Sequence, residues 1–521
     1  MVETENKLAI GSNENNSDTN SLDSRVDKSK KRNLFLLISS VGLGIFMAAL
    51  DESIINVSIA QIKLDLNEDP LRVQWIVLVY LLVIVALSAA SGYLGDRYST
   101  KIVFQIGMGI FAIGSLLCAL SQTLPMLIFA RIVQGIGGAG ILANGNAIVT
   151  RFTDESQRGL AIGLTSLVSA LAVVIGPVVG ALLTQFFKWQ VIFWINLPIG
   201  IIGIIYLQFS IPKTPTLRKE QKRADFLGSV LFATFLTILV LSISLFVDPV
   251  LPHPMIWSIV CFAISIALFV GFILWEKRSS NPFIELSLFK NKKFTIGLAC
   301  ALILYISLNS ISYQLPFYFK EVMNKELIEI GIVIVGVPVG IGISAPISGK
   351  ISSKINTRII SSIGLSVIAV AFIFLAIFLS PTMHLAFYVA LSFVIGLGVG
   401  FFIAPNSNSV MSSIKKDKLG VASSFLSLSR IVGYTIGTAL STTVLRFIQE
   451  LYQQRNGGVF NDAINYTPSL QIVFGIFCFF ATLSIIFSVI RGPDSYISNG
   501  IVTIDSLESK SSILDVSGPS K

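Results

Sequence analysis

Residues Phe46 to Ala60 read FMAALDESIINVSIA and place two adjacent carboxylates, Asp51 and Glu52, inside an apolar run that extends over residues 33–62. About 20 apolar residues suffice to cross a bilayer as a helix, so this run predicts a membrane span. A charged side chain at that depth costs about 2.5–3.5 kcal/mol on insertion scales, and it normally faces a protein interior or a wet path for ions or substrates. The alternative is a buried acid that only pairs with a neighbouring cation.

The composition indicates a membrane protein with many spans. Of its 521 residues 53% are hydrophobic and only 13% are charged, which excludes a soluble protein. The net charge of +9 does not indicate nucleic-acid binding, because the Lys and Arg residues lie in short loops between apolar runs. No loop contains a nucleophile and base, a metal-ligand cluster or a phosphate-binding loop, so we expect no enzyme, no cofactor and no metal site. The cysteines show no metal or disulfide spacing: Cys118, Cys261, Cys300 and Cys478.

Apolar runs of about 20 residues recur along the chain and predict fourteen transmembrane helices. They lie near 34–62, 72–93, 102–121, 124–150, 159–185, 191–210, 226–247, 256–276, 294–320, 327–349, 359–380, 383–412, 420–446 and 469–491. Cations are concentrated in every second loop, and this bias keeps its sign through all the alternations. Both termini should therefore be cytoplasmic.

An internal repeat divides the chain. The loop Gly92–Lys101 follows the second predicted helix, and Gly349–Arg358 follows the second helix of the last six; both have a glycine first and cations at positions six and ten. This predicts an all-α fold of two similar six-helix lobes with two extra helices between them. The predicted parts are a disordered cytoplasmic tail (1–32), an N-terminal lobe (33–210), two linker helices with cytoplasmic loops (211–293), a C-terminal lobe (294–491) and a second disordered tail (492–521).

Four motifs carry a family resemblance. Leu50–Ser58 matches the first-helix signature L-D-x-T-hydrophobic-hydrophobic-N-V-A, with serine for threonine and alanine, and Gly92–Lys101 matches G-x-L-A-D-R-x-G-R-K apart from Ser99 and Thr100. Arg131–Gly137 is the third, and Gly163–Ala181 matches G-x8-G-x3-G-P-x2-G-G with two glycines replaced by alanine. With these motifs in order on helices 1, 2–3, 4 and 5, the chain resembles the fourteen-helix drug:proton antiporter family of the major facilitator superfamily.

The buried charges are the candidates for proton coupling. At 1.5 Å per residue, Arg131 lies about 10 Å below the outer end of its helix and Asp51 about 16 Å below its own, so the two are within reach in depth. Arg131 could then hold Asp51 or Glu52 ionised until a proton or substrate competes. Arg430 lies about 15 Å into its helix by the same rise. Two acids balance two arginines, as a low-dielectric interior requires, but the sequence leaves open which arginine faces which acid. A structural ion pair is the alternative.

The loop after the second helix is a candidate gate. Asp96 can favour a helix N-terminus and pair, like Arg97, with an opposite charge across the lobe interface. Such contacts would stabilise a state closed to the cytoplasm, as the resemblance implies for Gly92, Asp96, Arg97 and Lys101. The alternative is that these are ordinary loop charges that only set the topology.

The fifth helix contains the antiporter signature. Gly176–Pro177 removes a backbone donor and permits a bend, while Gly163, Gly180 and Ala181 allow close helix approach. By resemblance this helix lies between the lobes and its bend is associated with exporters. Generic tight packing is the alternative.

Aromatic and amide side chains are the candidates for a substrate cavity. Tyr305, Asn309 and Tyr313 recur every four residues and share one helix face. A roomy aromatic cavity with few fixed hydrogen bonds suits lipophilic compounds of varied shape. Interhelical hydrogen bonds are the alternative for the amides, and interface anchoring is the alternative for Trp75 and Tyr80. The further candidates are Asn56, Trp75, Tyr80, Gln134, Asn144, Asn406 and Arg430.

We therefore expect a proton-driven exporter of amphipathic drugs or similar small molecules that works by alternating access in the plasma membrane, as a monomer. Burial raises a carboxylate's pKa and a nearby arginine lowers it, so a buried acid can be set to titrate in the working range. Three alternatives stay open: an importer or uniporter of a metabolite on the same fold, an exporter of organic anions with Arg430 as the counter-charge, and a membrane enzyme or receptor.

Overall fold

The computed structural model describes residues 35–153, 155–210, 225–246, 251–280, 282, 284, 286–352, 355–414, 419–455 and 462–492. Over these ranges every regular element is helical and no strand occurs. Fourteen of the described helices are long and apolar enough to cross a membrane. The all-α fold and the number of spans expected from the sequence are thereby confirmed.

The first helix spans Phe35–Leu66. The later elements are α2 (Pro70–Val73), α3 (Trp75–Arg97), α4 (Thr100–Leu120), α5 (Leu124–Phe152), α6 (Glu155–Phe186), α7 (Val191–Trp194), α8 (Asn196–Ser210), α9 (Phe226–Leu245), α10 (Pro254–Arg278), the 3₁₀ turn η1 (Leu286–Lys290), α11 (Lys292–Phe317), the π turn η2 (Tyr318–Val322), α12 (Leu327–Ile351), α13 (Thr357–Phe378), α14 (Leu385–Ser412), α15 (Leu419–Arg455) and α16 (Asp462–Ile490).

Polar caps begin several of these helices where the chain leaves the apolar layer. The side chains of Asp69, Ser99, Asn291 and Asn356 accept hydrogen bonds from the first backbone N–H groups of α2, α4, α11 and α13. Glu326 forms a capping box at the start of α12. Such caps matter in a membrane because lipid offers no partner to an orphan N–H group.

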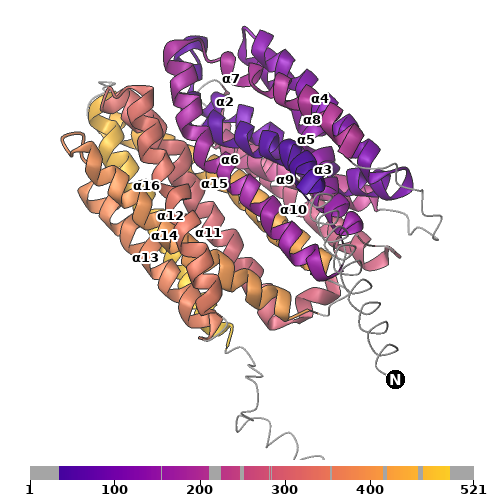
Figure 1. Cartoon of the computed structure of the whole chain (residues 1–521). Helices are drawn as coiled ribbons and strands as arrows, with labels where there is room; N and C mark the ends of the chain where they lie inside the picture. The colour runs from indigo at the N-terminus through magenta and orange to yellow at the C-terminus, as the bar shows by residue number, and fades with distance from the viewer. Residues whose placement is uncertain are drawn as a thin grey trace, which may run out of the picture.

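The helices form two bundles (Figure 1). The N-terminal bundle (residues 35–210) contains the close pairs α3–α5, α4–α5 and α4–α8, and the C-terminal bundle (residues 292–490) contains α12–α14, α13–α14, α13–α16 and α11–α15. The bundles touch where α6 packs on α12 and α15 packs on α3, while α9 lies against both α3 and α15 and carries α10 on its other side. The fold thus joins two helical bodies along a seam that crosses the whole molecule.

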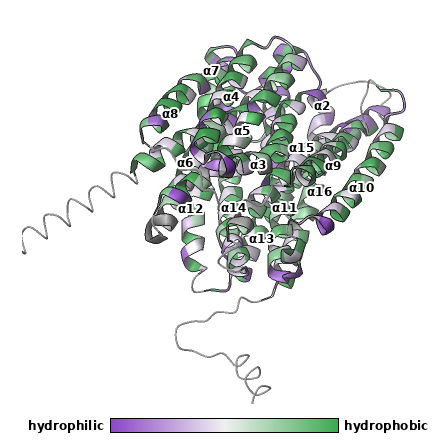
Figure 2. Ribbon diagram, turned by 90° about the vertical axis from the view of Figure 1, so that its right-hand side faces the viewer, coloured by the Kyte–Doolittle hydropathy of each residue, from purple (hydrophilic) through white to green (hydrophobic). Residues whose placement is uncertain are grey.

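Apolar side chains cover the outside of this assembly. Figure 2 shows hydrophobic residues along the helices and hydrophilic residues gathered near helix ends. α10 is the most exposed of the described spans. Only 17% of its most apolar segment is buried, and the side chains of Trp257, Phe262 and Phe269 are exposed. Exposed apolar side chains over whole helices suit contact with lipid.

The bundles are bonded to each other at the helix ends predicted to face outward. Lys63 of the first helix forms an ion pair of 2.6 Å with Glu321 of η2, and Gln185 of α6 donates to Glu326 before α12 at 2.9 Å. The Tyr313 hydroxyl donates to a backbone carbonyl of α2 at 3.3 Å. The structure is therefore closed on this face.

Candidate functional site

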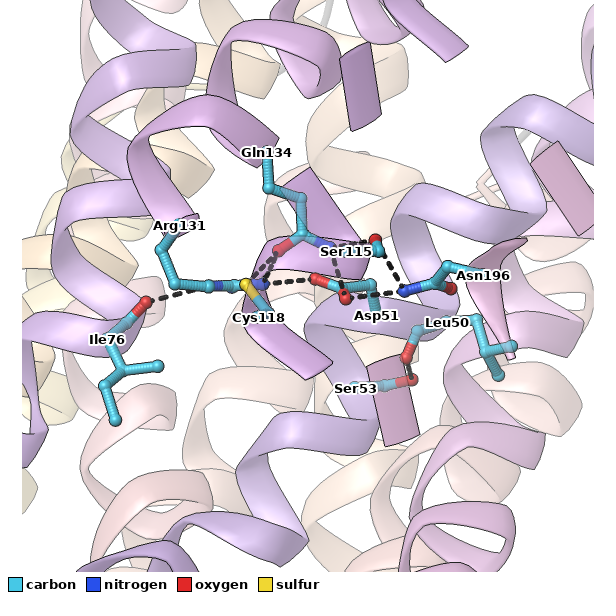
Figure 3. Close-up of polar contacts among 9 residues, drawn as sticks. All are labelled: Leu50, Asp51, Ser53, Ile76, Ser115, Cys118, Arg131, Gln134 and Asn196. Atoms are coloured by element: carbon cyan, nitrogen blue, oxygen red, sulfur yellow. Dashed lines mark hydrogen bonds and ion pairs between the residues drawn. The ribbon is translucent and has the colours of Figure 1, made fainter. Parts of the chain in front are cut away.

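Asp51 lies at the centre of a buried polar network inside the N-terminal bundle (Figure 3). It is 4% exposed. Arg131 Nη1 of α5 lies 2.6 Å from Asp51 Oδ2, while Gln134 Nε2 and Asn196 Nδ2 donate to Oδ1 at 2.8 and 2.9 Å. Three donors on two helices besides its own thus hold this carboxylate, which compensates the burial of its charge.

Arg131 is equally enclosed. Its Nε donates to the carbonyl of Ile76 at 3.0 Å and its Nη1 also donates to Gln134 Oε1 at 2.6 Å. The guanidinium carbon lies 4.2 Å from the centre of the Tyr80 ring and 6.0 Å from that of Phe193. A cation over an aromatic face is attracted to it, so the rings help to compensate the positive charge.

A second layer of contacts orients the amides. Gln134 Nε2 and Asn196 Nδ2 both donate to Ser115 Oγ of α4, at 2.8 and 3.2 Å. Gly114 explains how α4 comes this close, because a Cβ there would lie 2.5 Å from the backbone nitrogen of Gln134. Removing one partner of a buried, hydrogen-bonded ion pair typically destabilises a protein by about 3–5 kcal/mol, so the network is also structural.

The first helix connects the Asp51 network to α6 by direct packing. Ser53 Oγ, two residues from Asp51, lies 3.2 Å from the carbonyl of Ala172, and a Cβ on Gly176 would lie 1.8 Å from the same hydroxyl. A Cβ on Gly180 would lie 3.0 Å from the carbonyl of Ile54. Glycines at these two positions therefore let the first helix and α6 pack backbone to backbone.

α6 also packs on the other bundle. A Cβ on Gly331 of α12 would lie 2.9 Å from the Pro177 carbonyl and 2.8 Å from the Ala181 methyl group. The proline-containing stretch of α6 thus contacts the first helix on one side and α12 on the other. Gly163 lies on the same helix, but its surroundings fall outside the described residues.

The contacts described for the loop after α3 lie within the N-terminal bundle. Arg97 is exposed and donates to Tyr93 of its own helix at 3.2 Å. Lys101 is buried and donates to the Gln208 carbonyl at the end of α8, inside the same bundle. Nothing lies within 4 Å of a Cβ built on Gly92, and the Asp96 side chain falls outside the described residues.

Glu52 has different surroundings from Asp51. Like Asn56 one turn later, it is half-buried and lies on another face of the first helix. Its strongest opposite charge is Arg430 of α15, in the other bundle, and Glu52 is in turn the strongest opposite charge of Arg430. Arg131 thus pairs with Asp51 by direct contact, whereas the described side chains of Arg430 and Glu52 share no ion pair or hydrogen bond.

The remaining candidate cavity residues separate into groups. Asn144 donates to the carbonyls of Gly140 and Ser91, and Asn406 donates to Gly297 and accepts from Arg491; both amides thus bond neighbouring helices within one bundle. Trp75 lines a lateral groove with Leu124 and Ile128. Tyr80 and Gln134 belong to the Asp51 network and Tyr313 to the outer closure, whereas Tyr305 and Asn309 lie on α11 opposite α15.

Three residues are absent from the sequence-based candidates: Asn196 and Ser115 of the Asp51 network, and Tyr434, whose ring packs edge to face on Tyr305. Asn196 begins α8 as an amide in an apolar run, which is a usable signal for an intramembrane hydrogen bond. Ser115 and Tyr434 gave no comparable signal, because single serines and tyrosines are common in apolar spans. Their roles follow only from which helices become neighbours.

Comparisons with known proteins agree with this architecture. The sequence profile of the Major Facilitator Superfamily matches residues 41–438 and 297–500. The riboflavin transporter RibZ of Clostridioides difficile is 31% identical over 422 residues, which cover 81% of this chain and 90% of that protein. The putative multidrug resistance protein MdtD of Pectobacterium atrosepticum is 30% identical over 299 residues, covering 57% of this chain and 62% of its own length.

Solved structures show the same fold. A bacterial homologue of the human lysosomal transporter Spinster, in an inward-facing and unoccupied conformation, aligns with a TM-score of 0.62 at 14% identity over 88% of this chain and 97% of that one. The nucleoside transporter NupG aligns with a TM-score of 0.60 at 15% identity over 87% and 99%. These related proteins are transporters and not enzymes.

Proposed function

Because this chain belongs to the Major Facilitator Superfamily, we propose that it exports amphipathic drugs or similar small molecules in exchange for protons, by alternating access. The chain is a multi-pass membrane protein that transports small molecules. Efflux and proton coupling are the proposed refinements. They are supported by relatives named as multidrug resistance proteins and by the buried carboxylate of the first helix.

The observation that carries the proposal is the enclosed Asp51–Arg131 pair. A proton on Asp51 neutralises the charge that Arg131, Gln134 and Asn196 bond, so protonation weakens their hold on the first helix. Loss of the proton restores these bonds. One proton can thereby favour one arrangement of the helices over another, which is what an exchanger requires.

α6 provides a route from this carboxylate to the seam. The first helix packs on Gly176 and Gly180, and the stretch around Pro177 packs on α12 of the other bundle. A shift of the first helix on protonation would therefore move α6 and change its contact with α12 of the other bundle. In this proposal the two bundles act as the lobes that rock, and the outer contacts Lys63–Glu321 and Gln185–Glu326 break on opening outward.

We place the protein in the plasma membrane with both ends of the described chain in the cytoplasm. Fourteen spans, an even number, leave Phe35 and Gly492 on one side, and the cation-rich loops assign that side to the cytoplasm. Glu52 was grouped with Asp51 as a proton carrier on sequence grounds. Its different surroundings keep it outside the Asp51 network.

The test uses purified protein in liposomes with an imposed pH gradient and a fluorescent amphipathic dye. The wild type should accumulate dye against its gradient as protons move the other way, and Asp51→Asn should lose proton-driven accumulation. The matched control is Asp65→Asn, which removes an exposed carboxylate at the outer end of the same helix. Proton-driven accumulation by the Asp51→Asn variant at the wild-type rate would refute the proposal.

Import of a flavin-like metabolite is the second candidate. It is favoured by the riboflavin transporter that is 31% identical over most of both chains. Cells that cannot make riboflavin should then grow on low external riboflavin only when they produce this protein. Growth rescue without proton-driven dye efflux would favour this candidate over export.

A further inference from the structure

A long apolar groove runs along the outer face of the C-terminal bundle. It has a volume of about 840 Å³ and lies between α13 and α14, with Val489 of α16 at one end. The close neighbours of α13 are α14 and α16, and Figure 1 shows α13 at the edge of this bundle, away from the N-terminal bundle. The groove therefore lies on a face that meets lipid and not on the seam between the bundles.

The groove follows one face of α13 for most of the length of this helix. Its lining residues on α13 recur at three- and four-residue spacing from Arg358 to Phe374. At 1.5 Å per residue this stretch is about 24 Å long, whereas one leaflet contributes about 15 Å to the hydrocarbon core. The small side chain of Ala390 leaves room on the α14 side, and the rings of Phe374 and Phe387, with centres 6.3 Å apart, border the outer end. An extended hydrocarbon chain can thus lie in the groove over the depth of one leaflet.

Three polar side chains line the groove, and two of them already have partners inside the protein. Ser362 donates to the Ser488 hydroxyl of α16 at 3.0 Å, and Ser366 donates to the Ser362 carbonyl at 2.9 Å. The Arg358 guanidinium, at the start of α13, has no ion pair or hydrogen bond with any group that the structure describes. The groove therefore offers a ligand one positive charge, at the end that we place at the cytoplasmic surface, and otherwise apolar contacts.

The packing behind the groove keeps its shape. A Cβ on Gly364 of α13 would lie 2.5 Å from the Gly398 carbonyl of α14, so these helices meet backbone to backbone. Arg491, directly after α16, donates to Asn406 of α14 at 2.6 Å and to Thr357 of α13 at 3.4 Å. The three helices that line the groove are thus joined within one bundle, and a rigid-body motion of the bundles leaves the groove intact.

We propose that this groove binds one anionic phospholipid of the cytoplasmic leaflet, with its phosphate group on Arg358 and an acyl chain along α13 toward Phe374. A guanidinium matches two phosphate oxygens with parallel hydrogen bonds. Basic pockets between transmembrane helices on the cytoplasmic side suit acidic headgroups. A chain in the groove also supplies the dispersion contacts that an unfilled gap lacks. This site is independent of the transported substrate and of the direction of transport.

Charge favours this occupant over two others. A zwitterionic phospholipid fits the apolar part of the groove, but its own cation reduces the attraction to Arg358. A second copy of this chain, packed face to face, would present the same helices to the groove. α13 and α14 contain no acidic residue, so that copy would bring no counter-charge to Arg358 from either helix.

The test measures the first lipid bound to the full chain by native mass spectrometry from detergent micelles. The two probes are dioleoylphosphatidylglycerol, which is anionic, and dioleoylphosphatidylcholine, which has the same chains and no net charge. The wild type should bind the anionic lipid about fivefold more tightly, a ratio that corresponds to about 1 kcal/mol. Arg358→Gln should reduce the ratio to about one. Arg358→Lys should keep part of it, because the charge remains without the two parallel hydrogen bonds.

Ala390→Phe tests the apolar part of the site without changing a charge. It fills the groove and should bring the ratio close to that of Arg358→Gln. The matched control is Arg278→Gln, which removes an exposed arginine from the end of α10, outside the groove, and should leave the ratio unchanged.

Several outcomes would overturn the site. They are equal affinity of the wild type for both lipids, a ratio that survives Arg358→Gln, and an equal loss of the ratio in Arg278→Gln. A ratio that survives Ala390→Phe would mean that the lipid contacts Arg358 without entering the groove. A dimer in the same spectra that Ala390→Phe dissociates would assign the groove to a second copy of the chain. The charge and the groove are changed by separate variants, so a folding defect in one leaves the other decisive.

Discussion

Asp51 and Glu52 are neighbours in the sequence, yet the molecule treats their charges in opposite ways. The Asp51 carboxylate is enclosed by three donors, with its ion pair at 2.6 Å and both charges almost completely buried. The Glu52 carboxylate is half-buried, and its opposite charge belongs to a different bundle. One pair is complete within a single body, and the other is divided between two bodies.

The two pairs differ in what happens to their contacts when the bundles move relative to each other. A rigid-body rotation of the bundles does not itself break bonds within one bundle, so a charge held there stays compensated until a proton neutralises it. Bonds across the seam must break and form again, so a charge there is compensated only in some states or by a ligand. A pair within a bundle therefore suits a switch operated by a proton, whereas the surroundings of a charge at the seam change as the bundles move.

The largest expected contrast is in stability. Arg131→Gln leaves the Asp51 carboxylate buried without its cation and should lower the free energy of unfolding by about 3–5 kcal/mol. Arg430→Gln removes a half-buried cation that has no ion pair or side-chain hydrogen bond among the described residues, and it should lower this free energy by about 1 kcal/mol or less. Unfolding of both variants in detergent micelles, followed by circular dichroism, checks the difference.

A double variant controls for the loss of packing around Arg131. Combining Arg131→Gln with Asp51→Asn removes both charges and should recover most of the stability, because no uncompensated ion is left. If Arg430→Gln destabilised the protein as much as Arg131→Gln, the two pairs would be equivalent and the contrast would be wrong.

The next contrast is in side-chain length. Asp51→Glu adds a methylene group to a closely packed network and should cost about 1–3 kcal/mol, with a matching loss of proton-driven dye transport. Glu52→Asp shortens a side chain whose carboxylate has no hydrogen bond or ion pair among the described residues, and it should change the rate of proton-driven dye transport by about threefold or less. Dye transport in liposomes measures both effects, and equal sensitivity at both positions would contradict this assignment.

The sequence predicted the fold well because the bilayer imposes its own rule. A span needs about 20 apolar residues, so each of the fourteen helices can be identified from one continuous apolar segment of the sequence. The reach of Arg131 to Asp51 was likewise predictable, since helix rise gives depth in the membrane. Depth, however, carries no information about direction around the helix axis.

The faces of the site residues were therefore not predictable. Adjacent positions on a helix point about 100° apart, which separated Glu52 from Asp51 although one motif contains both. Asn144 and Asn406 looked like cavity residues but bond neighbouring helices, because an amide in an apolar span satisfies a carbonyl wherever one comes close. Which carbonyl comes close depends on tertiary packing.

The smallest expected effect concerns a pair that crosses the seam with direct contact. Lys63 and Glu321 bond at 2.6 Å at the outer rim, with side chains only 20% and 16% exposed, and pairs near the surface contribute about 0.2–1 kcal/mol. Glu321→Gln should therefore shift the balance toward the outward-open arrangement by about fivefold at most. Spin labels on the exposed residues Leu64 and Asn324, in a cysteine-free background, measure this shift by electron–electron double resonance. The outward-open arrangement should appear as a larger share of long distances between the two labels.

The control for this prediction is the charge exchange Lys63→Glu with Glu321→Lys, which should restore the wild-type distribution of distances. An unchanged distribution in Glu321→Gln would mean that this cross-seam pair does not hold the outer face closed.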